Sequence, residues 1–313
     1  DKLHALVRAS IEEYIDRVLP DLCEKSARFR YLFNRLCAAV ERIMDEVSEE
    51  LQSSDFEPLA FELAFGADGQ LPAITIREEN GTARVVGKVD RVDGWLHDGK
   101  LYLRVVDYKT GKKSFDLAEL RYGLGLQMLL YLFTLKEEGQ MLFGGHEIVP
   151  AGVLYTPARE PMLRCARDTE PEKIEKALKK ELRRSGMVLE DPAVLQAMEH
   201  SALESPCYLP IAVKRDGAVT GSLASAEQLG KLSKYVDHIL HEITQEVFAG
   251  NIDADPYART PQQSACTYCE FASACHFENG CGSDRMEYIK ATKNDEFWQY
   301  IDEVNGEGAH ENG

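Results

Sequence analysis

The sequence has no apolar run that approaches the roughly 20 residues needed to span a bilayer. Its N-terminus also lacks the basic and apolar regions of a secretory signal peptide. We therefore expect a cytoplasmic protein with no membrane partner. The chain opens without Met, on a stretch that already has the pattern of an amphipathic helix, so we expect it to be a piece of a longer protein.

Positive charge is scarce as well, with 36 Lys and Arg against 53 Asp and Glu and a net charge of -17. Nonspecific attraction to nucleic acid depends on Lys and Arg near phosphates, so the surface as a whole does not favour it. A nuclease site, however, uses acidic residues to hold a divalent metal and needs basic residues only where the strand passes. The run "KTGKK" from Lys109 to Lys113 is such a local basic spot, although it fits a solvated turn equally well.

The length of 313 residues and the 44% of hydrophobic residues fit one large domain or two ordinary ones. Apolar residues recur at helical spacing from Leu3 to Val18 and from Phe29 to Leu51, which predicts two helices whose apolar faces pack as core. A long helix is predicted over 115–139. Between 159 and 221 the chain looks charged and irregular, and the further helices are predicted over 171–184, 192–202 and 224–248.

The period changes to strand alternation from Pro58 onward. Asn80-Gly81 and Asp98-Gly99 are hairpin turn signals between alternating runs, so an antiparallel meander is predicted, followed by another strand near 146–156. Helices, antiparallel strands, a helix and a strand in this order predict an α/β fold, an α+β mixed sheet with flanking helices.

Charged residues occupy strand positions where a buried strand would carry aliphatic ones: Asp90, Asp107 and Lys109. Because strand side chains alternate faces, Asp107 and Lys109 share one face, and hairpin pairing brings Asp90 near Asp107. Two close carboxylates repel unless a cation lies between them, and a divalent metal would supply it. Structural ion pairs of Asp107 with Lys109 and of Asp90 with Arg91 are the alternative, which is the commoner outcome for an isolated Asp-x-Lys.

Three further polar residues change the balance. Glu62 interrupts an apolar alternation, while Gln127 and Tyr131, four apart, lie on one face of the predicted helix unless they are ordinary helix surface. In combination, the polar residues resemble the nuclease core of the RecB family in the PD-(D/E)xK superfamily by their order: Glu62, Gly87-x-x-Asp90, Asp107-x-Lys109, Gln127-x-x-x-Tyr131.

The resemblance covers nearly the whole chain. The stretches "VGKVDRVDG", "LRVVDYKTG", "YGLGLQMLLYL", "AGVLYTPARE" and "CTYCEFASAC" are similar to the C-terminal nuclease region of the AddB family, subunits of bacterial AddAB helicase-nucleases. The resemblance implies a restriction-endonuclease-like core, Mg2+, and exonucleolytic hydrolysis of DNA phosphodiesters in double-strand break processing and recombinational repair. It also implies an AddA-like subunit as the heterodimer partner.

Site roles follow from the resemblance residue by residue. They are metal ligation by Asp90, Asp107 and the carbonyl of Tyr108, water orientation by Lys109, metal support by Glu62, and positioning of the strand or the lysine by Gln127 and Tyr131. Family members also carry a metal-binding His in a helix before the first core strand. The sequence has no convincing counterpart, because His4 is interpreted as a helix-surface histidine.

Four of the eight cysteines crowd into the motif Cys266-x2-Cys269-x5-Cys275-x5-Cys281. In a reducing cytoplasm such spacing favours metal binding over disulfides, and four thiolates suit zinc or an iron-sulfur cluster. The resemblance favours a [4Fe-4S] cluster on Cys266, Cys269 and Cys275, with a fourth Cys upstream of this chain and Cys281 as a weaker candidate. We expect the three thiols to lie within ligand reach of one another.

We divide the chain into N-terminal helices (1–55), a nuclease core (56–160), a helical elaboration (161–250) and a cysteine-rich segment (251–313), all parts of one nuclease domain. Two other functions stay open. One is a catalytically silent DNA-binding or scaffold domain of the same fold, which has no need of Asp90, Asp107 and Lys109 together. The other is a zinc-bound protein-interaction module at the cysteine-rich end, which metal analysis would distinguish.

Overall fold

The computed structural model describes residues 2–18 and 26–311, with side chains described up to residue 306. The chain separates into two compact units, and each unit draws on three segments of the sequence. The sheet unit comprises 1–62, 89–114 and 143–225, and the helix unit comprises 63–88, 115–142 and 226–313.

Over the part of the chain that the structure describes, the sheet unit contains four helices and the strands of the central sheet. In chain order its elements are α1 (Lys2–Val18), α2 (Ala27–Gln52), β1 (Glu57–Phe65), β4 (Gly87–His97), β5 (Lys100–Lys109), β6 (Glu147–Pro157), α5 (Pro171–Glu181), β7 (Ser185–Leu189), α6 (Pro192–Met198), β8 (Ile211–Val213), β9 (Val219–Gly221) and β10 (Leu223–Ala224). Strands β1 and β4 pass from the segments of one unit into those of the other.

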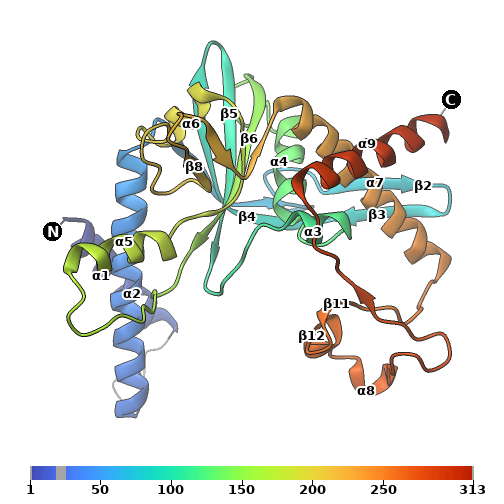
Figure 1. Cartoon of the computed structure of the whole chain (residues 1–313), viewed down its shortest axis with the longest axis horizontal. Helices are drawn as coiled ribbons and strands as arrows, with labels where there is room; N and C mark the ends of the chain where they lie inside the picture. The colour runs from blue at the N-terminus through green and yellow to red at the C-terminus, as the bar shows by residue number, and fades with distance from the viewer. Residues whose placement is uncertain (1, 19–25, 312–313) are drawn as a thin grey trace. The chain divides into compact units, whose positions relative to one another are not determined.

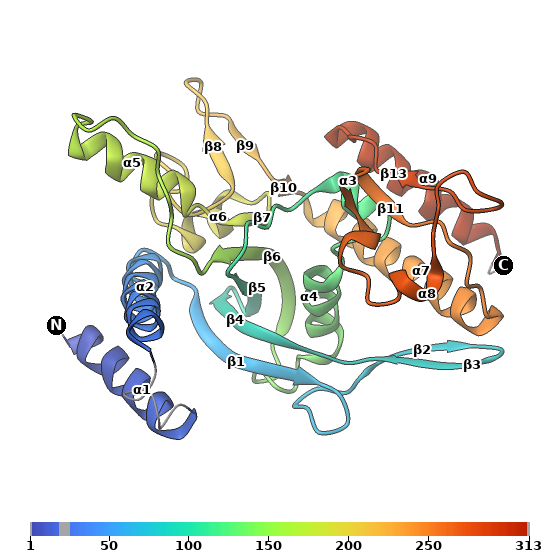
Figure 2. The same ribbon diagram turned by 90° about the horizontal axis from the view of Figure 1, so that it is seen from below.

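The central sheet has the strand order β1-β4-β5-β6-β7-β10. Figure 1 shows its middle strands β4, β5 and β6, and Figure 2 labels the others as well. Strand β5 pairs antiparallel with β4 and parallel with β6, while β7 pairs antiparallel with β6 and parallel with β10. Its middle strands are almost fully buried, because runs such as Leu103–Val106 carry few polar side chains. The predicted mixed sheet with flanking helices is confirmed.

The turn between β4 and β5 fixes the register of the strands that matter most for function. Asp98 and Gly99 both have positive φ, at 48° and 77°, as a two-residue hairpin turn of type I′ requires. His97 therefore pairs with Lys100, and every later pair along the hairpin follows from that position. This hairpin was predicted from the Asp-Gly dipeptide and is confirmed.

The predicted meander is wrong in one part, because β2 (Ile74–Glu78) and β3 (Gly81–Val85) form a separate two-stranded hairpin. Its strands carry Thr and Arg on one face, and Ile76 is the residue in them that is buried, which is too little apolar surface for a central strand.

The region 159–221 is also more regular than predicted. The short run Gly186–Leu189 is buried without alternation, so its strand character was hidden.

The predicted helix over 115–139 is two helices, α3 (Leu117–Arg121) and α4 (Gln127–Glu138). Gly123 and Gly125 between them have φ of 70° and 72°. A right-handed helix cannot contain this left-handed backbone, which glycine adopts at little cost. The apolar period continues through the break, and this is why periodicity alone predicted one helix.

The prediction that the apolar faces of α1 and α2 are buried in the core is wrong for part of these faces. The two helices lie side by side (Figure 2), yet Leu6 and Leu36 are each 59% exposed. Between the helices runs an apolar groove of about 670 Å³, lined among others by Leu3, Leu6, Tyr14, Leu36 and Val40. Within the described residues, the two helices therefore cover each other only in part.

The helix unit is built around α7 (Ala226–Ala249), which packs against α4, β2 and α9 (Asn294–Glu311). Tyr235 of α7 is fully buried, and its hydroxyl donates to the main-chain carbonyls of Leu120 and Arg121. The remaining elements are small: β11 (Tyr257–Thr260), β12 (Gln263–Ser264), η2 (Ala265–Tyr268), α8 (Ala272–Cys275) and β13 (Glu287–Tyr288). Among the described helices, none is both long and apolar enough to cross a membrane.

Candidate active site

Asp90 and Asp107 lie near each other where β4 begins and β5 ends. Arg91 pairs with Val106 in the hairpin register, so one step further sets Asp90 opposite Asp107. The Oδ2 atom of Asp90 accepts the main-chain N–H of Tyr108 at 2.8 Å. The side chain of one strand is thus fastened to the backbone of the other beside the second carboxylate.

Lys109 completes the group. Its Nζ lies 2.7 Å from Oδ2 of Asp107, and the two side chains are 35% and 12% exposed. Burial raises the pKa of Asp107, and the charge of Asp90 acts in the same direction, while the ammonium of Lys109 opposes both. The site therefore holds a partly buried carboxylate that is more easily protonated than an ordinary Asp despite its lysine partner.

The alternative in which Asp90 pairs with Arg91 is wrong. Arg91 turns to the other face of β4, where its Nε lies 2.8 Å from Oδ1 of Asp93 and both side chains are almost completely buried. The guanidinium of Arg91 also donates to the hydroxyl of Tyr108. The Asp90 carboxylate thus accepts from the main chain of Tyr108 and does not pair with Arg91.

A group of buried charges lies on β4, β5, α2 and the residue before β7, and the sequence analysis did not predict it. We call it the arginine cluster, and its members are Arg91, Asp93, Arg104, Glu50 and Arg184. Arg104 donates through Nε to Oδ2 of Asp93 at 2.9 Å, and Arg184 donates to Oε2 of Glu50 at 2.6 Å. Each member is at most 4% exposed. The cluster ties α2 to β4, β5 and the residue before β7, so it holds the two site strands in place.

Glu50 shows why the cluster tolerates its charges. Burial alone would raise the pKa of this carboxyl, but the nearby Arg184 and Arg104 lower it below the ordinary value, so it stays ionised. The available sequence signal was the placement of Asp93 and Arg104 inside otherwise apolar strands. Their partner Glu50 lies on a distant helix, which strand patterns cannot indicate.

Glu62 lies at an irregular point of β1. Its φ is 52°, an uncommon conformation for a residue other than glycine. The burial phase of the strand changes there, since Phe61 and Glu62 are both exposed while Leu63 is buried. The expected support of a metal by Glu62 stays a prediction.

Gln127 and Tyr131 lie on α4 of the helix unit. The Nε2 atom of Gln127 donates to the hydroxyl of Tyr131 at 3.0 Å, and Tyr131 is only 4% exposed. Its ring stacks on Phe65, and its hydroxyl oxygen lies where a Cβ added to Gly87 would be 2.2 Å away. Tyr131 is therefore not ordinary helix surface. The expected role of both residues in positioning the strand or the lysine stays a prediction.

His4 is bound elsewhere. Its Nε2 lies 2.7 and 2.9 Å from the two carboxylate oxygens of Asp45, a partly exposed pair that joins α1 to α2. The interpretation of His4 as a helix-surface histidine is thus confirmed.

The cysteines do not converge as expected. Cys266 lies in the single turn η2, Cys275 ends the short helix α8, and the thiols of Cys269 and Cys275 are exposed. Throughout the described parts of the chain, no three His, Cys, Asp or Glu side chains are gathered closely enough to hold a metal ion. The expected iron-sulfur cluster on Cys266, Cys269 and Cys275 therefore stays a prediction.

A divalent cation fits the two carboxylates better. Mg2+ is commonly bound through one or two carboxylates, with waters and substrate phosphates as its other ligands, so a third acidic side chain is not required. Asp90 and Asp107 supply such a pair of oxygen donors next to the main chain of Tyr108. The donor set is that of a hard cation and not of a zinc or iron site.

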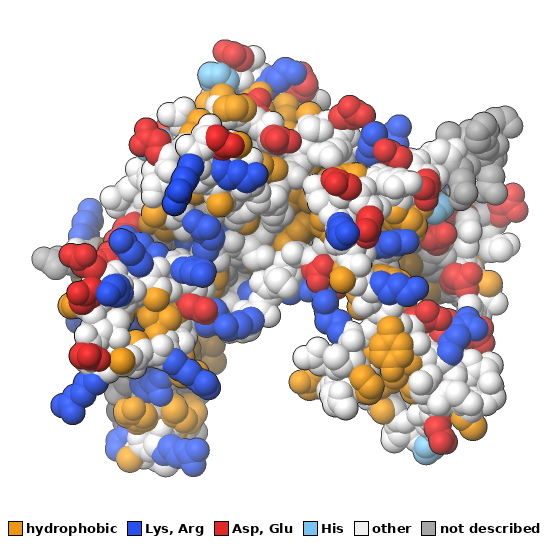
Figure 3. Space-filling model, in the orientation of Figure 1, with side chains coloured by type: hydrophobic (Ala, Val, Ile, Leu, Met, Phe, Trp, Pro, Cys, Tyr) orange, Lys and Arg blue, Asp and Glu red, His pale blue; other side chains and the backbone are white. Residues whose placement is uncertain are grey.

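Basic residues surround the end of β5. A hollow of about 360 Å³ beside Lys109 is lined also by Lys112, Lys113, Arg159 and Arg183. Figure 3 shows Lys and Arg side chains gathered on this part of the sheet unit, over α5 and its neighbours. The local charge is thus opposite in sign to the net charge of the chain.

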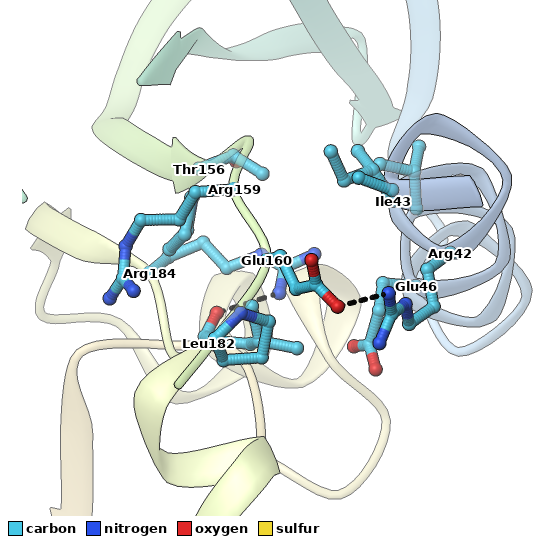
Figure 4. A pocket seen from close by; sticks show the side chains of 12 residues that line it. Arg42, Ile43, Glu46, Thr156, Arg159, Glu160, Leu182 and Arg184 are labelled. Atoms are coloured by element: carbon cyan, nitrogen blue, oxygen red, sulfur yellow. Dashed lines mark hydrogen bonds and ion pairs between the residues drawn. The ribbon is translucent and has the colours of Figure 1, made fainter. Parts of the chain in front are cut away.

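Glu160 fixes the segment that carries Arg159. Its carboxylate accepts from Arg42 at 2.9 Å and from Arg35 at 3.0 Å, both on α2. Figure 4 shows the small pocket that results, with Arg42 and Glu46 of α2 on one side and Thr156 and Arg159 on the other. The segment after β6 is therefore held against α2, and the backbone at Arg159 is placed with it.

Comparison with known proteins identifies the family of the chain. The model of the PD-(D/E)XK nuclease superfamily matches residues 2–276. Relatives named as the B subunit of an ATP-dependent helicase/deoxyribonuclease include those of Ruminiclostridium cellulolyticum, 31% identical over 297 residues, Acetivibrio thermocellus, 33% over 294, and Clostridium botulinum, 32% over 295.

The matches cover 93 to 94% of this chain but only 26% of each relative, so the chain spans about a quarter of their length. These names are those of the AddB proteins that the motifs resemble. The order of acidic, basic and amide residues, the hairpin that joins Asp90 to Asp107, the mixed sheet and these matches agree with one another. The chain belongs to the PD-(D/E)XK nuclease superfamily.

Proposed function

We propose that this chain is the nuclease domain of an AddB-like helicase-nuclease subunit and that it hydrolyses DNA phosphodiester bonds as an exonuclease. The observation that carries the proposal is the meeting of Asp90, Asp107 and Lys109 at one end of the β4–β5 hairpin. The biological setting that we propose is double-strand break processing for recombinational repair, in keeping with the helicase/deoxyribonuclease names of the relatives.

The metal in this proposal is Mg2+, held by Asp90, Asp107 and the carbonyl of Tyr108. When bound, such an ion polarises a phosphoryl oxygen and lowers the pKa of a water ligand. Burial and the charge of Asp90 raise the pKa of Asp107, so a cation between the two carboxylates would relieve their repulsion and favour the ionised form of both.

The remaining work falls to the side chains of this chain. Lys109 is a fixed cation beside Asp107, so we propose that it orients the attacking water and stabilises negative charge as it develops on the phosphate. Tyr108 is held by Arg91 through its hydroxyl and by Asp90 through its N–H, which keeps both strands in register. Glu62 is proposed to support the metal or its waters, and Gln127 and Tyr131 to position the strand or the lysine.

The partners in this proposal are DNA and an AddA-like subunit, in a heterodimer. Support comes from the names of the relatives, which describe one subunit of an ATP-dependent helicase/deoxyribonuclease. The rival is a silent DNA-binding or scaffold domain of the same fold. The nuclease and a silent DNA-binding domain would both bind DNA, so cleavage of DNA is the property that distinguishes the two functions.

An iron-sulfur cluster on Cys266, Cys269 and Cys275 is a second proposal, and its support is the spacing of these cysteines alone. It requires a fourth thiolate from a longer chain and a rearrangement of the cysteine-rich segment. The measurement is metal and acid-labile sulfide analysis of the full-length subunit. Iron with sulfide that is lost on Cys269→Ser would support the cluster, whereas zinc without sulfide would favour the protein-interaction module.

The nuclease proposal is tested by Mg2+-dependent degradation of linear DNA. The assay uses the full-length subunit in complex with a helicase subunit whose own nuclease site is disabled. Lys109→Ala should abolish cleavage and retain Mg2+ binding, while Asp107→Ala should lose both. Lys100→Ala, at the other end of β5, removes the same charge as Lys109→Ala and should cleave normally. Undiminished cleavage by the Lys109 and Asp107 variants would show that these charges are structural.

A further inference from the structure

The basic hollow next to Lys109 is built from three separate parts of the sheet unit. Parallel strands β5 and β6 end at the same edge, where the N–H of Ala158 donates to the carbonyl of Lys109 at 2.8 Å. Lys112 follows β5, Arg159 follows β6, and Arg183 lies between α5 and β7. Five cations with Lys113 and Lys109 thus converge on one hollow in a chain of strongly negative net charge.

One carboxylate stands among these cations. The Oε2 atom of Glu181, the last residue of α5, accepts from Arg159 at 3.1 Å and lies 3.4 Å from Nζ of Lys112. The same oxygen therefore joins the segments that follow β5 and β6. A phosphate oxygen would meet the same two cations with the same charge-assisted contacts.

We propose that this hollow is the phosphate track for the DNA strand next to the scissile bond, and that Glu181 occupies a phosphate position in the free chain. The proposal rests on the nuclease function above and adds its strand-binding residues. Lys112, Arg159 and Arg183 bind backbone phosphates, and Glu181 gives up its two cations when the strand enters. In the absence of DNA, the Glu181 carboxylate holds Arg159 and Lys112 in place. When DNA binds, it competes with the phosphates for these two cations and so weakens DNA binding.

The charge of the hollow favours the phosphate backbone over the bases. Its lining combines Lys109, Lys112, Lys113, Arg159 and Arg183 with the carboxylate of Glu181, and Lys112 and Lys113 are exposed. Lysine and arginine side chains contact phosphates without reading sequence, so the track should bind all sequences alike. Binding should also fall steeply with salt, because each phosphate contact releases counterions.

The experiment measures binding of a labelled single-stranded oligonucleotide to the full chain by fluorescence anisotropy, in EDTA and over a range of salt. Lys112→Ala should weaken binding about ten-fold, the effect of one charged contact. It should also reduce the slope of log affinity against log salt by about 0.7. Glu181→Gln should tighten binding several-fold, because it frees two cations.

The chain offers a matched control for each variant. Lys100 and Glu147 form an exposed ion pair of 3.0 Å at the opposite end of β5 and β6. Lys100→Ala and Glu147→Gln change the net charge by the same amounts, and both should leave affinity and salt slope unchanged. Equal effects of the Lys112 and Lys100 variants, weaker binding by Glu181→Gln, or no binding by the parent chain would overturn the proposal.

Cleavage is scored separately, so the two proposals can fail independently. DNA bound through the track but never cleaved with Mg2+ would overturn the nuclease function and keep the track. If the parent chain cleaves normally but the Lys112 variant binds DNA like the Lys100 variant, the track is overturned and the nuclease function is kept. Arg183→Ala gives a second reading at a half-buried position, with the unfolding midpoint as the check that it folds.

Discussion

Asp93→Asn should destabilise the sheet unit strongly, although Asp93 is not one of the residues of the proposed site. Its carboxylate accepts from Arg91 at 3.1 Å and from Arg104 at 2.9 Å, and all three side chains are at most 1% exposed. The arginine cluster holds three arginines and two carboxylates, so its net charge rises from +1 to +2 when Asp93 becomes neutral.

Removing one member of a buried ion pair typically costs about 3–5 kcal/mol, because the partner charge stays buried without compensation. Each charged hydrogen bond alone is worth about 1.5–3 kcal/mol, and bonds to a shared carboxylate do not add independently. The amide oxygen of the substituted side chain keeps one acceptor. We therefore expect the free energy of unfolding to fall by about 3–5 kcal/mol and not by the sum of the separate bonds.

The assay is urea unfolding followed by tryptophan fluorescence. The chain has two tryptophans, and Trp298→Phe leaves Trp95, which lies on β4 two residues after Asp93 and reports on the sheet unit. Glu147→Gln in the same background removes a carboxylate from an exposed pair and should leave the midpoint nearly unchanged. If Asp93→Asn shifts the midpoint no more than this control, the arginine cluster does not stabilise the strands as argued.

Two further predictions concern the site and its neighbourhood. The raised pKa of Asp107 means that the folded chain binds this proton more tightly than the unfolded chain, so the free energy of unfolding loses this contribution as pH rises from about 4 through the raised value. In metal-free buffer the stability of Asp107→Asn should not show this decrease with pH. If the unfolding midpoints of parent and variant change in parallel over this pH range, the prediction is contradicted. Gly87→Ala would place a Cβ 2.2 Å from the buried hydroxyl of Tyr131 and should cost about 1–3 kcal/mol. Gly111→Ala, where an added Cβ meets nothing within 4 Å, is its control, and equal denaturation midpoints would refute the close packing.

The hairpin and the helices could be predicted because their signals are local. Asp98-Gly99 specifies a turn through its own backbone preferences, and the placement of Asp107 and Lys109 on one face follows from alternation alone. The division of α3 from α4 was missed because Leu124 continues the apolar period between two glycines. Local patterns thus gave the elements of the candidate site but not every boundary.

Contacts between distant segments could not be predicted in the same way. An amphipathic helix reveals that it has an apolar face, but not what covers it, so the exposure of Leu6 and Leu36 was unexpected. Glu50 and Arg184 meet across 134 positions of sequence, and no spacing rule connects them. The cysteine spacing indicates a possible ligand set, but convergence of the thiols depends on the ion and on a fourth ligand.

The division of the chain has a practical meaning for anyone who dissects this protein. The backbone passes between the two units five times, after residues 62, 88, 114, 142 and 225. Neither unit is therefore a continuous stretch, and no single truncation point releases one of them intact. Loss of cleavage in a shortened fragment would report the loss of shared strands such as β1 and β4, so deletion mapping cannot assign activity to one unit. Point substitutions, or grafts that exchange all three segments together, are the informative experiments.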